Sequence, residues 1–281
     1  MRNLKLNLFF KELLMFLLVQ IFGLFAALEL IKKGIVVYVP AATKYSSESS
    51  LILNFVFAFL IATVMLVILL RYFKRSAGLF KIIFAFSLFI GIDFIFQSLV
   101  SEPWALILAL FFISLYFLFS KVWLHDLAII IGIAGISIWL GFGFTSRAMI
   151  AILIIISIYD FIAVYKTKHM VSMFRNLSAE GVYFSTVIPE KMAQMKTNMA
   201  DVRPEKGFMF LGTGDMAFPL MFAVSALPLG FKSSIGIIIG SAIGVAAVHL
   251  FFVSQKERKP MPALPPIAAG AIVGFLVSLV I

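Results

Sequence analysis

The chain has 281 residues, of which 63% are hydrophobic and only 13% are charged. No water-soluble domain of this size has such a composition, so the chain is predicted to be an all-α membrane protein that crosses the bilayer several times. It contains no cysteine, which excludes disulfides, thiolate metal sites and a cysteine nucleophile. The formal net charge of +10 is better explained by the sorting of loop charge across a bilayer than by binding of nucleic acid.

The first apolar segment is interpreted as a retained helix rather than a secretory signal. It is longer than a typical signal core, and no convincing small-residue cleavage site follows it. Because a helix needs roughly 20 apolar residues to cross the hydrocarbon, the sequence predicts nine transmembrane spans. Their approximate limits are 13–31, 51–70, 79–100, 104–120, 127–144, 148–165, 208–227, 233–253 and 263–281.

The basic residues of the predicted loops support this count. If the spans alternate in direction, the loops on the side of the amino terminus hold 18 Lys and Arg residues, and the loops on the other side hold 5. A miscounted span would scramble the alternation for every later loop. Because basic loops remain in the cytoplasm, we expect a cytoplasmic amino terminus and a carboxyl terminus outside.

The spans fall into two groups separated by one long connection. Residues 1–165 hold spans one to six, and residues 208–281 hold spans seven to nine. The connection, 166–207, carries seven basic residues and some apolar patches. It is interpreted as a flexible cytoplasmic loop, with an interfacial gate or a self-cleavage segment as the alternative.

Glycines recur at four-residue spacing along the last two predicted spans. Such spacing lets helix backbones approach closely, so these are interpreted as close-packing faces. The residues are Gly236, Gly240 and Gly244 in span eight, and Gly270 and Gly274 in span nine.

Three acids lie well inside predicted spans, namely Asp93, Asp160 and Asp215. An ionisable group in hydrocarbon is unfavourable unless it is paired or hydrated, so each is a candidate functional residue. Asp160 on span six and Asp215 on span seven lie ~9 Å and ~13 Å of helix rise from the same cytoplasmic face, so they reach nearly one level. Asp93 lies deeper, at ~18 Å, and its simplest role is a buried polar contact with Gln20, Gln97 or a backbone carbonyl.

Two carboxyl groups that face each other at low dielectric cannot both ionise cheaply, so they tend to share one proton. This arrangement suits peptide hydrolysis by activated water, and it needs no metal or other cofactor. The ionised member takes a proton from water while the protonated member polarises the scissile carbonyl, and the roles reverse as the amine leaves. We expect the side chains of Asp160 and Asp215 to approach within ~7 Å, so that one water can bridge them.

The backbone near Asp215 is predicted to be irregular. Gly212 and Gly214 let another chain come close, and Pro219 cannot donate a hydrogen bond to the carbonyl of Asp215. A water-filled opening would give the freed carbonyls partners. The alternative is a kink that only lets helices pack.

Four prolines stand at the start of span nine, in the sequence KPMPALPPIAAG (259–270). They forbid a regular helix there, so the chain is predicted to enter the membrane in extended form. An extended segment on the same side as both aspartates would hold an unwound substrate by strand addition, because a protease must bind its peptide extended. The alternative is a device that only starts the helix.

Three motifs carry a resemblance to a known family. IYDFIAVY (158–165), LGTGD (211–215) and PALP (262–265) resemble the YD, GxGD and PAL motifs of the presenilin and signal peptide peptidase family of intramembrane aspartyl proteases. They occur in order on spans six, seven and nine, and together they are highly specific. The resemblance covers the whole chain and implies a presenilin-like fold of nine transmembrane helices.

The resemblance also implies roles for single residues. Asp160 and Asp215 would be the catalytic pair. The other motif positions would shape the active site, support it or help to place substrate; they are Tyr159, Gly212, Thr213, Gly214, Pro262, Ala263 and Leu264. Thr213 differs from the leucine common in animal presenilins, so no fine cleavage preference is carried over.

The implied substrates are single-span transmembrane proteins or peptides, cut within the lipid bilayer near their cytoplasmic ends, and nucleic acid is not an expected partner. The cytoplasmic amino terminus and the PALP form look more like presenilin than like signal peptide peptidase. The chain departs from presenilin in having no long hydrophilic tails and no large acidic loop. The resemblance therefore implies a compact prokaryotic, archaeal-type homologue in the cell membrane, acting without accessory subunits or a cofactor.

The residues by themselves leave another class of function open. Buried aspartates on broken helices also build ion sites, so an ion-coupled transporter or a cation channel is the alternative. That alternative would explain Asp93 but gives no reason for the proline-rich segment. The sequence has no His-Glu-x-x-His pair for zinc, and His249 in span eight is interpreted as a packing or interfacial residue.

Overall fold

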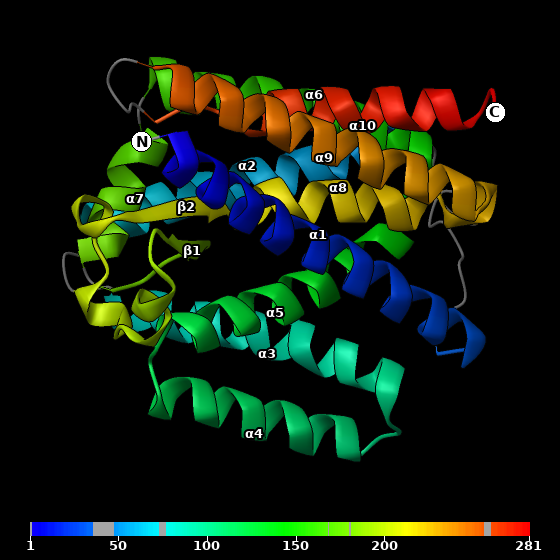
Figure 1. The fold of residues 1–281 in the computed structure, drawn as a ribbon. Coiled ribbons are helices and arrows are strands. Elements are labelled where there is room, and N and C mark those ends of the chain that lie inside the picture. The colour runs from blue at the N-terminus through cyan, green and yellow to red at the C-terminus, as the bar shows by residue number, and fades with distance from the viewer. Residues whose placement is uncertain (1, 36–47, 73–76, 168, 180, 256–259) are drawn as a thin grey trace.

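A computed structural model describes residues 2–35, 48–72, 77–167, 169–179, 181–255 and 260–281. Within these ranges the chain forms ten α-helices and one two-stranded antiparallel sheet (Figure 1). The helices are α1 (Arg2–Lys32), α2 (Glu48–Tyr72), α3 (Ala77–Leu99), α4 (Trp104–Leu118), α5 (Val122–Phe142), α6 (Ser146–Phe161), α7 (His169–Ala179), α8 (Thr213–Ser225), α9 (Phe231–Ser254) and α10 (Leu264–Ser278). The strands are β1 (Ser185–Pro189) and β2 (Phe208–Gly212), and the short turns are η2 (Ile162–Lys166), η3 (Met192–Lys196), η4 (Met199–Asp201), η5 (Pro204–Lys206) and η6 (Leu227–Leu229).

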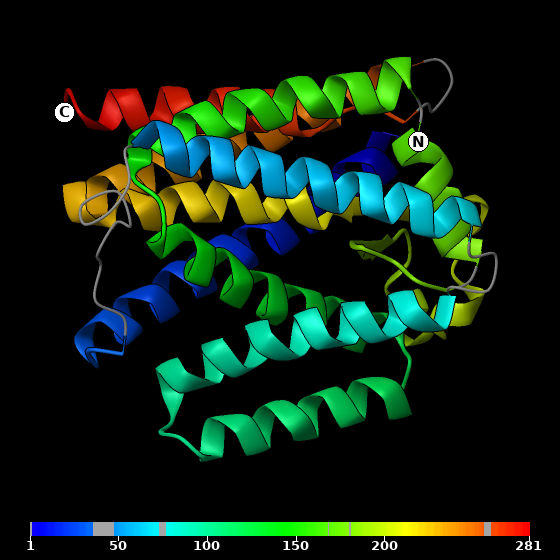
Figure 2. The same ribbon diagram turned by 180° about the vertical axis from the view of Figure 1, so that it is seen from behind.

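The helices form two groups, with α1 and α8 between them (Figures 1 and 2). One group contains α6, α9 and α10, and the other contains α3, α4 and α5, while α2 lies outside against α6 and α7. Helix α8 is buried on two faces, with Leu220 and Val224 in one hydrophobic core and Met221 and Phe222 in the other. Residues four apart share a helix face, so this pattern places α8 at the centre of the bundle.

Six of the described helices are long and apolar enough to cross a membrane, and these are α1, α2, α3, α5, α6 with η2, and α9. Helices α4, α8 and α10 are apolar but shorter. Each of the nine predicted spans overlaps one of these nine helices. The termini lie at opposite ends of the bundle, as an odd number of crossings requires (Figure 1). The number of crossings and the side of each terminus stay predictions.

The glycines of α9 and α10 face each other, as their spacing suggests. A Cβ atom added to Gly240 would collide with the carbonyl oxygen of Gly270, and one added to Gly236 would meet the carbonyl oxygen of Gly274. The interpretation as close-packing faces is therefore confirmed, because only a hydrogen side chain allows these backbones to come so near.

The prediction that span seven begins as a helix at residue 208 is wrong. Residues 208–212 form strand β2, and α8 begins only at Thr213. Gly207 has a φ of +81° and turns the chain into the strand. All five residues of β2 pair with β1, so the extended backbone finds its hydrogen bonds in a sheet instead of a helix.

The expected break of the helix near Asp215 is also wrong. Helix α8 continues through Pro219 to Ser225, and the non-helical backbone is confined to the strand before it. Proline has a helical φ, and its missing hydrogen bond is tolerated where neighbouring helices supply other contacts. One such contact comes from Gln20 of α1, whose Nε2 donates a hydrogen bond of 2.8 Å to the carbonyl oxygen of Met216.

The connection 166–207, interpreted from sequence as a flexible loop, is folded over its described residues; only residues 168 and 180 lie outside the description. It holds α7, β1 and three 3-10 turns. Its apolar side chains form a small core with the starts of α5 and β2, made of Val122, Tyr183, Val187, Met199, Val202 and Phe208. The apolar patches of this segment are thus buried against one another, at the end of the bundle where the amino terminus lies (Figure 1).

Candidate active site

Asp160 and Asp215 lie on two packed helices, α6 and α8, and α8 directly follows strand β2 of the sheet. Asp160 is the last residue but one of α6 and is 8% exposed. Asp215 is the third residue of α8 and is partly buried. The two carboxyl groups lie within electrostatic range of each other. Their approach within ~7 Å, the reach of one bridging water, stays a prediction.

Asp160 contacts the start of the last helix. Residues 260–263 form no helix and α10 begins at Leu264, so the predicted non-helical start is confirmed. The Leu264 N–H donates a hydrogen bond to Asp160 Oδ2 at 3.4 Å. The first N–H groups of a helix have no partner within it, and Pro265 and Pro266 carry none, so Leu264 is the free donor of this turn. The helix N-terminus also favours a negative charge beside it.

Pro262 and Ala263 complete the proline-rich segment. Pro262 is buried, and Ala263 is the residue that precedes the first turn of α10. The backbone of Ala263 has φ −90° and ψ −30°, which are angles of the helical region. The non-helical stretch that can adopt an extended form therefore ends before Ala263.

Asp215 is held by the glycine three residues before it. The Gly212 N–H donates a hydrogen bond to the Asp215 carboxyl group. A Cβ atom on Gly212 would lie 2.9 Å from Asp215 Oδ2, closer than carbon and oxygen atoms pack. A Cβ atom on Gly214 would meet only the ring of Phe218, at an ordinary 3.7 Å. Of the two glycines, Gly212 is the one whose missing side chain makes room for the carboxyl group.

Tyr159 and Thr213, each close to one aspartate, connect the site to other elements. The ring of Tyr159 packs edge-on against Phe59 of α2, with centroids 5.1 Å apart, and its hydroxyl hydrogen-bonds the side chain of Thr63. Thr213 donates from both its N–H (3.2 Å) and its hydroxyl (3.3 Å) to the carbonyl oxygen of Phe184, just before β1. The Asp160 side is thereby linked to α2, and the Asp215 side to the sheet.

A buried pair of ionisable residues near Asp215 is absent from the sequence interpretation. Glu12 Oε2 of α1 lies 2.6 Å from His249 Nδ1 of α9, and both residues are at most 6% exposed. The charge of Glu12 also acts on Asp215. Glu12 stands one residue before the predicted first span, and His249, interpreted from sequence as a packing or interfacial residue, is also the partner of Glu12. The sequence did offer a signal for this pair, because an acid and a histidine lie at similar depth on two antiparallel spans.

Two other acids, Asp93 and Asp126, lie within helices of the bundle. Gln97 Nε2 donates a 2.8 Å hydrogen bond to Asp93 Oδ2, which agrees with the simplest interpretation of Asp93. Asp126, with its neighbour His125, lies at the start of α5 and is 1% exposed. The predicted fifth span begins at residue 127, so both residues stand just outside it.

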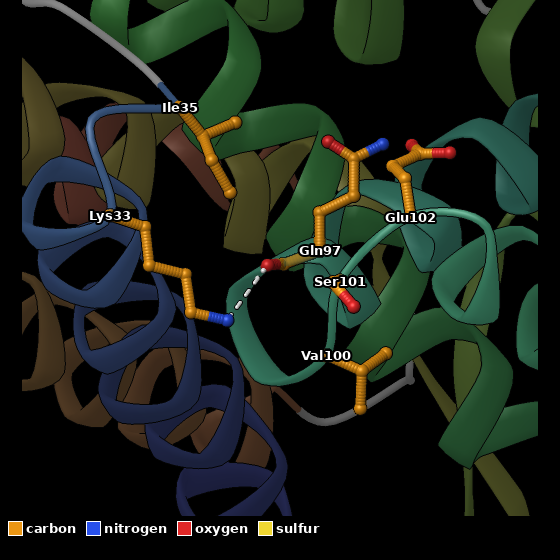
Figure 3. A pocket seen from close by; sticks show the side chains of 6 residues that line it. All are labelled: Lys33, Ile35, Gln97, Val100, Ser101 and Glu102. Carbon is orange, nitrogen blue, oxygen red and sulfur yellow. Dashed lines mark hydrogen bonds between the residues drawn. The ribbon is translucent and has the colours of Figure 1, made fainter.

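A hollow of about 380 Å³ lies at the other end of the bundle, between the end of α1 and the α3–α4 connection (Figure 3). Lys33 Nζ crosses it to donate a 3.2 Å hydrogen bond to the carbonyl oxygen of Gln97. None of the residues predicted for the site lines it; those that do are Lys33, Ile35, Gln97, Val100, Ser101 and Glu102.

The comparisons with known proteins agree with the motifs. A sequence model of the family described as signal-peptide peptidase, presenilin aspartyl protease matches residues 13–281. Two solved structures, each described as a presenilin family intramembrane aspartate protease, are similar to the chain. The one in space group C222 is 25% identical, covers 94% of each chain and has a TM-score of 0.61. The one in space group P2 is 25% identical, covers 96% of each chain and has a TM-score of 0.65. No protein with a curated description matches.

The matched region includes both aspartates and all three motifs, and the likeness to solved structures extends over nearly the whole fold. The resemblance identified from the motifs is therefore confirmed. The chain belongs to the signal peptide peptidase and presenilin family of aspartyl proteases, and it is an intramembrane-cleaving aspartic endopeptidase.

Proposed function

We propose that this protease hydrolyses peptide bonds within the transmembrane helices of single-span membrane proteins, with Asp160 and Asp215 as the catalytic pair. The observation that carries the proposal is that both carboxyl groups are held in the same way. Each accepts a hydrogen bond from a backbone N–H, that of Leu264 for Asp160 and that of Gly212 for Asp215. Two carboxyl groups that face each other at low dielectric tend to share one proton, which is the state this reaction needs.

In the proposed reaction the ionised aspartate takes a proton from a water molecule as the water oxygen attacks the scissile carbonyl carbon. The protonated aspartate donates a hydrogen bond and then its proton to the carbonyl oxygen. Collapse of the tetrahedral species breaks the C–N bond, and the amine leaves with the proton first taken from water. One hydroxyl of the tetrahedral species gives its proton back to the second aspartate as the C–N bond breaks, which leaves a carboxylic acid product and restores the shared-proton state of the pair. The backbone donors of Leu264 and Gly212 fix both carboxyl groups during these transfers.

The substrate is proposed to bind in extended form. In the described residues β2 has β1 as its strand partner along one edge, and it runs directly into α8 and Asp215. A peptide can add to the other edge of such a strand through main-chain hydrogen bonds. Residues 260–262, which precede Ala263 and the start of α10 near Asp160, offer a second stretch of backbone. We propose that both stretches help to unwind a substrate helix next to the aspartates.

The cellular setting belongs to the same proposal. The loop charges support nine crossings, a cytoplasmic amino terminus and a site near the cytoplasmic face. Substrates would then run with their amino ends outside. Following the resemblance of the motifs, we also propose that the chain acts without accessory subunits, in a prokaryotic cell membrane.

A peptide assay tests the proposal. The purified protein is incubated in detergent with a single-span peptide, and the fragments are identified by mass spectrometry. Asp160→Asn and Asp215→Asn should each abolish cleavage while the unfolding temperature changes little, because a neutral group in the same place avoids the cost of a buried charge. Asp93→Asn is the matched control, since it removes a carboxyl group that contacts Gln97, and it should retain cleavage.

The runner-up, an ion-coupled transporter or cation channel, is tested with the same variants in liposomes. An intact peptide together with an ion flux that depends on Asp160 and Asp215 would contradict the proposed protease function. Cleavage that survives either aspartate substitution would contradict the assignment of the pair.

A further inference from the structure

Helix α5 begins with two consecutive buried ionisable residues that bind the backbone of β1. His125 and Asp126 are each 1% exposed. His125 Nε2 lies 3.0 Å from the carbonyl oxygen of Ser185, and the Val187 N–H donates a 2.7 Å hydrogen bond to Asp126 Oδ1. A carbonyl oxygen can only accept, so His125 carries its hydrogen on Nε2. Its Nδ1 then faces the hydroxyl of Tyr116 at 3.2 Å.

These contacts fall on the edge of β1 that is turned away from β2. Backbone groups of a strand alternate between its two sides. The carbonyl of Phe184 bonds Thr213 next to β2, so the groups of odd-numbered residues such as Val187 face the other way. Pro189 agrees with this register, because its missing N–H belongs to the outer edge and leaves no gap in the pairing with β2.

A third side chain extends the same edge. Lys11 Nζ of α1 donates at 2.8 Å to the carbonyl oxygen of Pro189, the last residue of β1, and at 2.9 Å to that of Glu190, which follows the strand. Side chains of α5 and α1 therefore occupy the place that a further strand would take beside β1. Buried backbone groups need hydrogen-bond partners. Along this edge of β1, side chains of α5 and α1 supply them.

The closed edge is connected to Asp215 through a short chain of backbone hydrogen bonds. Strand β1 pairs with β2 over five residues, and Thr213 bonds Phe184 at the end of the sheet. β2 passes without a linker into α8, and Gly212, its last residue, is the donor to Asp215. A shift of β1 along α5 would therefore move Gly212 and the carboxyl group it holds.

We propose that Asp126 and His125 are positioning residues of the protease, which set the place of Asp215 by fixing the β1–β2 sheet against α5. The inference rests on the proposed role of Asp215. Asp126 touches neither Asp215 nor substrate, and its effect passes through the sheet. Its Oδ2 has no hydrogen-bond partner in the described part of the chain, so only the oxygen that binds Val187 carries the role.

The test compares four variants of the full-length protein in detergent. Asp126→Ala removes the acceptor for Val187, whereas Asp126→Asn keeps an oxygen in the same place. His125→Phe keeps a ring and removes the donor to Ser185. Ser137→Ala is the matched control, because Ser137 is a buried polar residue of the same helix that bonds only the carbonyl of Ile133 among the contacts of the described chain.

The kinetic readouts are kcat, KM and the bonds that are cut, measured with the single-span peptide. Asp126→Ala should lower kcat on the order of 10- to 100-fold and add cuts at neighbouring bonds, because small displacements of a catalytic group have effects of this size. KM should change far less. His125→Phe should act in the same direction, and Asp126→Asn and Ser137→Ala should stay near the wild-type values. A wild-type kcat and a wild-type cutting pattern in Asp126→Ala or His125→Phe, with only a lower unfolding temperature, would overturn the proposal.

A second readout does not depend on proteolysis. The chain has no cysteine, so spin labels can be placed on Lys206→Cys beside β2 and on Leu250→Cys, an exposed residue of α9. The distance distribution between the labels should broaden in Asp126→Ala and His125→Phe but not in Ser137→Ala. An unchanged distribution would overturn the proposal even if cleavage falls. A wild-type protein that leaves the peptide intact contradicts the proposed function itself, whatever the labels show about the sheet.

Discussion

The two aspartates are held by different kinds of structure. On the Asp160 side, the support is local, since one helix end meets another and a single N–H of Leu264 contacts the carboxyl group. On the Asp215 side, the support is long-range, since Gly212 belongs to a sheet whose other strand is bound by α5 and α1. A change on the first side should therefore act near its own position. A change on the second side should reach the site from a distance.

This difference matters because the reaction needs both carboxyl groups in one geometry. Helix packing fixes Asp160 together with α10, whereas Asp215 depends on elements that lie outside the apolar bundle. The sheet therefore helps to fix the position of Asp215, although this end of the protein is formed largely by the connection 166–207. Four sets of variants separate the two kinds of support, beginning with a pair that joins them.

The largest effect on stability is expected at the Glu12–His249 pair. Lys11, the residue before Glu12, binds the end of β1. His249 lies on α9, which packs against α10, the helix that contacts Asp160. The Glu12–His249 pair therefore connects both regions. His249→Leu leaves the Glu12 carboxyl group buried without its partner and should lower the free energy of unfolding by about 3–5 kcal/mol. Glu12→Leu combined with His249→Leu should regain most of that loss, because no buried carboxyl group is then left without its partner.

A double-mutant cycle measured by chemical unfolding in detergent checks this pair. Additive effects of the two single substitutions would show that the contact of 2.6 Å carries no coupling. Cleavage by the double variant, measured against its folded fraction, would show how much the pair contributes to joining the two sides of the site.

The next effect tests the Asp215 side alone, at Gly212. Its φ of −62° and ψ of 143° suit any residue, so Gly212→Ala adds no backbone strain. The added methyl group would lie 2.9 Å from Asp215 Oδ2 and must displace it. We expect kcat to fall on the order of 100-fold, with little change in unfolding temperature. Gly214→Ala is the matched comparison, because its methyl group meets only Phe218 at 3.7 Å, and it should cost much less activity. Equal losses for both variants would contradict the role given to Gly212.

The sequence predicted the Asp160 side better than the Asp215 side, and the reason is physical. Prolines act on their own neighbours, so the non-helical residues 260–263 follow from the sequence directly. The strand at 208–212 depends instead on pairing with 185–189, and its apolar residues satisfy a helix pattern equally well. Whether such a run becomes strand or helix is decided by a distant partner.

Acids at span ends were the second source of error. Glu12 and Asp126 each stand one residue outside a predicted span, where hydropathy alone suggests a loop. In the structure both are buried, because His249 and the Val187 N–H supply partners. A polar residue beside a span can be buried whenever the fold brings a partner to it, and spacing within one segment carries no information on that.

A smaller effect is expected from the packing of α9 on α10, which supports the Asp160 side. A methyl group on Gly240 would meet the backbone of Gly270, and backbone atoms cannot rotate away as a side chain can. Gly240→Ala should therefore lower the free energy of unfolding by about 1–3 kcal/mol. Gly78→Ala in α3 is the matched control, because nothing lies within 4 Å of the added atom, and it should leave stability unchanged or slightly higher. Thermal unfolding in detergent measures both, and an undiminished unfolding temperature for Gly240→Ala would contradict the tight contact.

The smallest effect should come from the hydroxyl of Tyr159, one residue before Asp160. Tyr159→Phe keeps the ring against Phe59 and removes the hydrogen bond to Thr63. A single neutral hydrogen bond is worth about 0.5–1.5 kcal/mol, so kcat should fall no more than about tenfold. Thr63→Val removes the same bond from the other partner and should give a similar loss. A loss that is far larger for Tyr159→Phe than for Thr63→Val would mean that the hydroxyl takes part in the proton transfers of the aspartates. In that case the local support of Asp160 would include a chemical group as well as a contact between helices.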